Sequence, residues 1–184
     1  MLEFFQWLGN TGWSVALIES LYVWSFLESA HVLFLGLFVG TVLMMDLRLL
    51  GLAFKGIPAS HFTRNLLPWS RIGFALMVTT GIPLFYSNPA GYYQNFFFRM
   101  KMVALVLAGV NVWLFHSQIH RKVSEWDEDP RPPRAARVAA AVSIFTWIIV
   151  VVAGRFTAYN WFDCDLQPHS DFVNWAAGCV VEGE

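Results

Sequence analysis

The chain has 184 residues, of which 57% are hydrophobic and only 14% are charged. Its mean hydropathy is +0.50. Soluble domains carry about a quarter charged residues, so the composition excludes one and predicts a membrane protein in contact with the lipid bilayer. The formal net charge of −1 gives no basis for binding nucleic acid, which we exclude as a partner.

The first residues include one acidic side chain and three bulky aromatic ones, Glu3, Phe4, Phe5 and Trp7. A signal peptide would instead begin with basic residues and end at a small-residue cleavage site. We therefore expect the start of the chain to be retained as a short interfacial helix.

Four apolar stretches follow, at residues 21–43, 67–85, 102–115 and 138–153. With their flanking residues, each reaches the roughly 20 residues that cross a bilayer as a helix. The sequence thus predicts an all-α fold, a four-transmembrane-helix bundle. The bundle with its N-terminal interfacial helix would occupy residues 1–160, and a C-terminal tail would occupy residues 161–184.

The basic residues predict the orientation of this bundle. Nine of the twelve Lys and Arg residues lie in or beside the first and third connections between the apolar stretches. By the positive-inside rule these connections are cytoplasmic, so both termini face the other compartment. The nine residues are Arg48, Lys55, Arg64, Arg71, Arg121, Lys122, Arg131, Arg134 and Arg137. The third connection, which is rich in charge and proline, is expected to be an exposed loop.

The first apolar stretch has two faces at about 100° per residue. Glu28, His31 and Asp46 lie on one side, followed by the small residues Ser25, Ser29, Gly36 and Gly40. We expect this half of the helix to contact protein, because small residues permit close helix approach in membranes. The opposite half, which includes Phe38 and Thr41, is expected to face lipid.

Placing ionisable side chains such as Glu28 and His31 inside a membrane costs free energy, so we expect each to have a partner or a function. One interpretation is an ion pair between Glu28 and Arg155 with His31 nearby, which would only fix helix packing. A second makes His31 an axial ligand of haem b, with Arg155, Lys101 or Arg99 binding the propionates. A third is a proton relay through Glu28 and His31, because histidine titrates near neutral pH.

The second haem ligand is the weak point of the haem interpretation. His31 and His116 differ in expected depth by roughly 16 Å, because about 1.5 Å of rise separates successive residues. A shared haem is therefore not expected. Met77 and Met102 are the remaining candidates for the second ligand.

His116 and His120 are four residues apart and project from one helix face. Together with His61 they are a weak candidate metal site, since two nitrogen ligands do not complete one. The alternative is that these histidines complement the carbonyl end of the helix. The sequence contains no phosphate-binding glycine loop, CxxC, CxxCH or HExxH motif, so we expect no catalytic activity and no catalytic residues.

Six segments resemble a family of small bacterial four-helix inner-membrane proteins without a known function. They are residues 28–40, 46–51, 66–70, 98–101, 114–116 and 153–159. The resemblance implies the four-helix fold and a bacterial inner membrane, so both termini and the tail would be periplasmic. A weaker likeness at the level of the fold connects the chain to four-helix b-type cytochromes and to the membrane domains of copper-resistance proteins.

The two cysteines, Cys164 and Cys179, lie in the tail, where an oxidising periplasm would allow a disulfide. The alternative is two unrelated thiols in a mobile tail. Our functional hypothesis is an integral inner-membrane subunit that binds haem b and passes electrons between quinone and a periplasmic partner. The alternative is a cofactor-free structural or accessory subunit of a membrane complex.

Overall fold

The computed structural model describes residues 1–159, 161–162 and 164–179, apart from the side chains of residues 118–122. Within this part of the chain the regular structure is helical throughout, which confirms the all-α prediction. The α-helices are α1 (Leu2–Gly9), α2 (Gly12–Glu19), α3 (Leu21–Leu50), α4 (Ala59–Ser87), α5 (Pro89–Tyr93), α6 (Phe96–Leu114), α7 (Arg134–Phe156) and α8 (Asp171–Ala177). A π-helical turn (Phe115–Ile119) and two 3-10 turns (His120–Glu125 and Thr157–Tyr159) complete the set.

Three helical segments are long and apolar enough to span a membrane. They are Leu21–Leu50, Phe96–Ser117 and Arg134–Tyr159, and they contain the first, third and fourth predicted stretches. The second predicted stretch lies in α4, which has 29 residues and a length of about 43 Å. Arg64, Pro68 and Arg71 make α4 less apolar than the other three.

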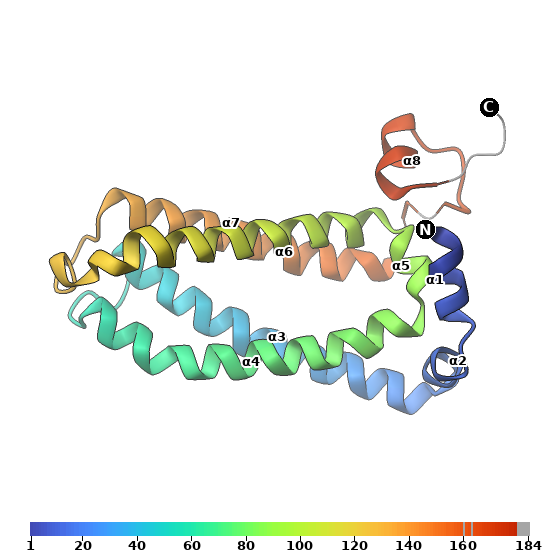
Figure 1. Cartoon of the computed structure of the whole chain (residues 1–184), viewed down its shortest axis with the longest axis horizontal. Helices are drawn as coiled ribbons and strands as arrows, with labels where there is room; N and C mark the ends of the chain where they lie inside the picture. The colour runs from blue at the N-terminus through green and yellow to red at the C-terminus, as the bar shows by residue number, and fades with distance from the viewer. Residues whose placement is uncertain (160, 163, 180–184) are drawn as a thin grey trace. The chain divides into compact units, whose positions relative to one another are not determined.

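The chain divides into two compact units that share the four long helices. Unit 1 comprises residues 1–30, 79–104 and 149–184, and unit 2 comprises residues 31–78 and 105–148. The four short helices α1, α2, α5 and α8 therefore all belong to unit 1 (Figure 1).

In unit 1, α1 and α2 are fixed to α5 and to the end of α4. The ring of Phe5 in α1 stacks on Tyr93 with centroids 4.7 Å apart. Ser14 in α2 is fully buried and donates a hydrogen bond of 2.8 Å to the backbone carbonyl of Tyr86. Phe4 in α1 and Trp13 in α2 remain exposed, as expected of helices at a membrane interface.

In unit 2, α3 and α4 are in contact through Phe38 and Gly73. A Cβ atom added to Gly73 would lie 3.0 Å from the backbone nitrogen of Phe38, so any larger residue would require the Phe38 backbone to move away. The Phe38 ring packs edge-on against Trp147 of α7 at 4.8 Å and lies 5.3 Å from Phe74 of α4. Phe38 thus joins three of the four long helices.

The predicted faces of α3 are partly wrong. Phe38 and Thr41, which were expected to face lipid, are buried. Ser25, Ser29 and Gly36, which were expected to contact protein, are exposed. The physical reason is that Phe38 fills the interior with aromatic contacts, whereas small side chains offer little surface to bury.

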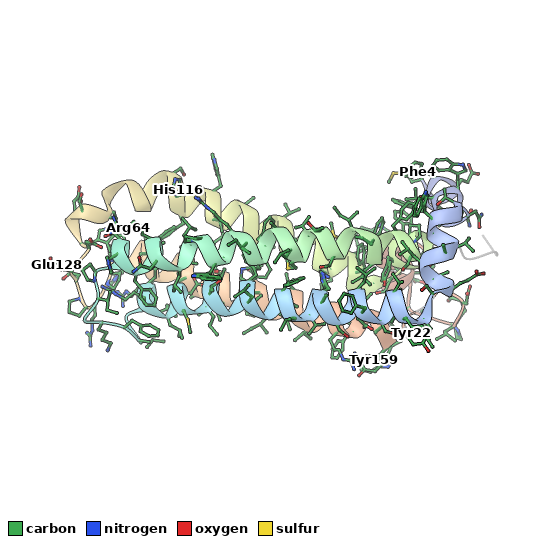
Figure 2. The ribbon with its side chains drawn as sticks, turned by 90° about the horizontal axis from the view of Figure 1, so that it is seen from below. Phe4, Tyr22, Arg64, His116, Glu128 and Tyr159 are labelled. Carbon is green, nitrogen blue, oxygen red and sulfur yellow. A yellow bond between two sulfur atoms is a disulfide. The ribbon has the colours of Figure 1, made fainter. Side chains whose placement is uncertain are left out.

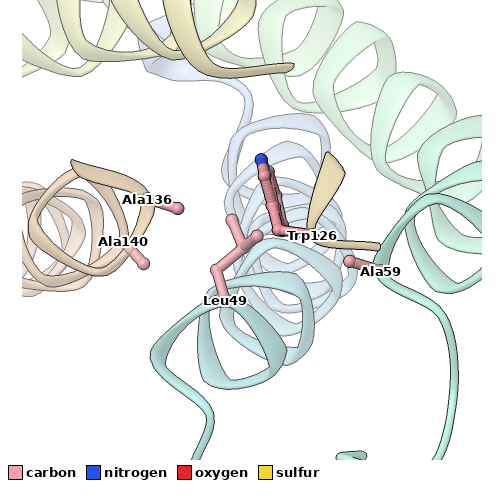
Figure 3. Close-up of a cluster of buried hydrophobic side chains, with 5 residues drawn as sticks. All are labelled: Leu49, Ala59, Trp126, Ala136 and Ala140. Atoms are coloured by element: carbon pink, nitrogen blue, oxygen red, sulfur yellow. The ribbon is translucent and has the colours of Figure 1, made fainter. Parts of the chain in front are cut away.

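The loop between α6 and α7 is exposed along most of its described length, including residues 128–131, as expected. Trp126 is the exception that the sequence did not predict. It is 7% exposed and packs in a cluster of buried side chains, Leu49, Ala59, Ala136 and Ala140 (Figure 3). Burying an indole ring stabilises a loop by about 2 kcal/mol or more, so Trp126 attaches the loop to the core of unit 2.

Replacement of Gly73 tests the contact between α3 and α4. We expect Gly73→Leu to lower the free energy of unfolding by about 2 kcal/mol or more, because its side chain must displace the backbone of Phe38. Thermal unfolding in detergent, followed by circular dichroism, measures this loss. Gly109→Leu in α6 is the control, since a Cβ at Gly109 meets no atom within 4 Å. Equal effects of the two substitutions would contradict this interpretation.

Candidate functional site

Glu28 lies in the part of α3 that belongs to unit 1, and it is half-buried. Its charge acts on Tyr92 of α5. Burial raises the pKa of Tyr92, and the negative charge of Glu28 raises it further. The structure therefore places the Glu28 carboxylate close to a phenol.

Arg155 is exposed and interacts with Tyr159, one turn further along the chain. It donates a hydrogen bond of 3.0 Å to the Tyr159 hydroxyl, and its guanidinium carbon lies 5.0 Å from the centre of that ring. The structure thus gives Arg155 an aromatic partner in place of the carboxylate of Glu28.

The two other cations proposed for haem propionates differ in their surroundings. Arg99 donates hydrogen bonds to the backbone carbonyls of Tyr93, at 2.7 Å, and Ala176, at 3.2 Å. Lys101 is half-buried, and its ammonium lies beside Gly154, where an added Cβ would be 3.6 Å from Nζ. Arg99 is therefore committed to the protein, whereas Lys101 makes none of the hydrogen bonds or ion pairs found among the described residues.

The candidate iron ligands are His31, Met77 and Met102. His31 is half-buried and Met77 is 8% exposed, and both belong to unit 2. Met102 is 45% exposed in unit 1. The helical rise from the Phe38–Gly73 contact places His31 and Met77 at positions along the helix axes that differ by about 5 Å. This difference is far smaller than the one expected between His31 and His116. A haem between them would have to separate α3 from α4 where the two backbones approach each other.

The predicted metal site finds little support. His61 and His116 are both exposed, and Figure 2 shows His116 on the surface of unit 2. The side chain of His120 lies outside the described residues. Among the side chains that the structure describes, no group of three His, Cys, Asp or Glu residues is close enough to hold a metal ion.

Asp46 was expected on the protein-facing side of the first stretch, but the sequence did not predict its partner. Asp46 is 6% exposed and is hydrogen-bonded to the side chain of Ser143 on α7. Its second carboxylate oxygen has no hydrogen-bond partner among the described residues. Asn111 of α6 binds α7 one turn away, with its side-chain nitrogen 3.0 Å from the carbonyl of Ala139. Polar side chains thus join α7 both to α3, through Asp46, and to α6, through Asn111.

Arg48 is the most buried charged side chain in unit 2, at 1% exposure. Its Nε donates a hydrogen bond of 2.8 Å to the carbonyl of Ile57. Its Nη2 lies 3.3 Å from the carbonyls of both Asp127 and Asp129. One guanidinium therefore connects the loop after α3 to the loop before α7.

Asp127 completes this connection by capping α4. Its carboxylate accepts hydrogen bonds of 2.6 Å from both the backbone nitrogen and the hydroxyl of Ser60, and its backbone carbonyl accepts one from Ala59. Burial acts to raise the pKa of Asp127, but the Ser60 hydrogen bonds and the charge of Arg48 together lower it. The carboxylate is thus held in its charged form at the start of α4, where the helix dipole also favours it.

Charged residues in the last turns of an apolar stretch were the signal that could have indicated Asp46 and Arg48. Arg48 was used only for the orientation of the bundle, and Asp46 only as a member of the protein-facing side of the first stretch. Their burial depends on α7 and on two loops, and hydropathy alone does not predict those contacts.

A comparison with protein families adds to this description. Residues 4–160 match the model of DUF6644, described as a family of unknown function. The chain belongs to this family. No curated protein and no solved structure matches it. DUF6644 membership therefore confirms the resemblance to an uncharacterised family and assigns no activity to any residue.

Substitution of Arg48 tests the connection between the loops. We expect Arg48→Met to lower the free energy of unfolding by about 2–4 kcal/mol, because three buried carbonyls lose a charged donor. Arg48→Lys should lower the free energy of unfolding by less than Arg48→Met does, because the ammonium keeps the charge but cannot reach all three carbonyls. The local readout is cleavage by a lysine-specific protease after Lys55, which should become faster. Arg64→Met is the control, as Arg64 is exposed, and cleavage unchanged in Arg48→Met would refute the role of Arg48.

Proposed function

We propose that this chain is an integral membrane subunit, without catalytic activity of its own, that acts by assembling with other membrane helices. In this proposal α4 is a fourth span, the membrane is a bacterial inner membrane and both termini are periplasmic. The contact of Phe38 with Gly73 supports the fourth span, because it places α4 against a helix that is itself long and apolar enough to cross. The basic residues at the connections support the orientation.

The small-residue face of α3 is the observation that carries this proposal. Ser25, Ser29 and Gly36 are exposed, and a Cβ added to Gly36 or Gly40 would meet no atom within 4 Å. The hydroxyls of Ser25 and Ser29 bind carbonyls one turn earlier in α3, at 2.7 and 2.8 Å. The face therefore has no bulky side chains, and its two serine hydroxyls already have hydrogen-bond acceptors. Such a surface suits close packing of a second transmembrane helix.

Bulky substitution on this face tests the assembly. We expect Gly36→Leu combined with Gly40→Leu to lower the mass of the complex purified in mild detergent, as measured by native mass spectrometry. The expected cause is that the leucines hold the partner helix away from the α3 backbone. Gly109→Leu is the matched control, since Gly109 is an equally open glycine on α6. A monomer in all three forms, or the same larger mass in all three, would contradict the proposal.

A second candidate function is electron transfer between quinone and a periplasmic partner through a haem b bound at His31. It is favoured by Lys101, a half-buried cation that could meet a propionate. Met77 is the preferred second ligand because it is buried and near His31 in height. This candidate ranks second because Arg99 and Arg155 already have partners.

An absorption spectrum tests the haem. The reduced-minus-oxidised spectrum of the purified protein, expressed with ample haem, should show a b-type α-band that disappears in His31→Ala. His116→Ala is the control and should retain the band. Absence of the band in the folded wild-type protein would eliminate the electron-transfer candidate and leave the assembly proposal intact.

A further inference from the structure

The segment after α7 is folded against unit 1. Cys164 and Cys179 form a disulfide with an S–S distance of 2.08 Å. The segment between them contains α8, which ends at Gly178 in the left-handed conformation with φ of 71°. The guanidinium of Arg99, on the first turns of α6, fills the space beside Gly178 and donates a hydrogen bond to the Ala176 carbonyl. The disulfide closes the segment around α8, and Arg99 holds α8 beside the start of α6 (Figure 1).

One face of α8 is aromatic and has no covering residues in the described structure. Phe172 is 64% exposed and Trp175 is 77% exposed, and their ring centroids are 6.2 Å apart. Leu166, in the loop before α8, is 59% exposed. Large apolar groups held in the open on a fixed scaffold indicate an interaction surface.

The depth of α8 identifies the environment of this surface. The Phe172 ring lies 6.4 Å from the ring of Phe96, and Phe96 is the first residue of a segment that is long and apolar enough to span a membrane. Phe172 is therefore level with the point where that span begins. Rings of Trp and Phe at this level lie among lipid headgroups.

Other exposed aromatic residues of unit 1 are consistent with this level. Trp7 and Trp13, on α1 and α2, are 63% and 80% exposed, and these helices are attached to α5 and to the end of α4. Residues 161–179 contain no Lys or Arg that could attract anionic lipid, so their insertion would depend on apolar side chains. Asp171 lies in the first turn of α8, at the edge of the aromatic face, where its carboxylate can remain in water.

We propose that α8 is a membrane-interface anchor, in which Phe172, Trp175 and Leu166 insert at the boundary between headgroups and acyl chains of the leaflet next to unit 1. The disulfide and Arg99 hold the rings in position beforehand, so little conformational entropy is lost on insertion. The segment would thereby fix the height and tilt of α6 and α7 in the bilayer.

Quenching of tryptophan fluorescence tests the anchor. The full chain is reconstituted in vesicles of phosphatidylcholine with brominated acyl chains, and the emission lost in Trp175→Phe gives the signal of Trp175. We expect bromine to lower this signal about twofold or more and aqueous iodide to change it little, because the ring lies at the boundary between headgroups and acyl chains. Trp113→Phe, from an exposed position within a span, provides the lipid-exposed reference.

The other outcomes overturn the proposal. Quenching of Trp175 by iodide but not by bromine would place α8 in water, where its aromatic face would serve a soluble partner. Quenching by neither would show that protein covers the ring, as in contact with a second copy. Circular dichroism of Trp175→Phe checks that the variant is folded, and Trp126→Phe gives the behaviour of a buried ring.

Discussion

The guanidinium of Arg48 is the interaction on which the organisation of unit 2 depends. A charge at 1% exposure is tolerated only when hydrogen bonds replace its water. Here three backbone carbonyls accept hydrogen bonds from Nε and Nη2, whereas Nη1 has no hydrogen-bond partner among the described residues. Because those carbonyls belong to two loops, the loops must adopt defined conformations for the charge to be buried. The buried position of Trp126 and the capping of α4 by Asp127 occur in the same connected region. The hydrogen bonds of Arg48 and the burial of Trp126 thus depend on the same loop conformations.

The membrane imposes a matching constraint on the helices. In hydrocarbon each backbone polar group must be satisfied within the protein, which helices achieve by themselves. Apolar side chains gain little from leaving lipid for the protein interior, so close fit decides which helices touch. Phe38 and Gly73 illustrate this rule, since the absence of a side chain on one helix admits the backbone of the other. The face at Gly36 has the same chemistry, but an added Cβ there would meet no atom of the described residues within 4 Å.

The candidate site was chosen from the sequence by residue type, and its partners were assigned by depth. Glu28 and His31 were singled out because ionisable groups are rare in apolar stretches, and both are half-buried. Arg155 was matched to Glu28 by depth alone, yet the nearby Tyr159 ring is its partner. Depth follows from residue count, whereas pairing depends on rotation about each helix axis, which residue count leaves open.

The sequence by itself determined that the chain is helical and membrane-like, because helix length and hydropathy are properties of consecutive residues. Membership of an uncharacterised family was also readable from short motifs. Only the tertiary structure decided which face of α3 is buried, because that choice depends on Phe38 meeting Trp147 from a distant helix. It also decided that Arg48 and Trp126 belong to the core, since their contacts join residues about 80 positions apart. Interactions over such separations leave no periodic pattern in the sequence.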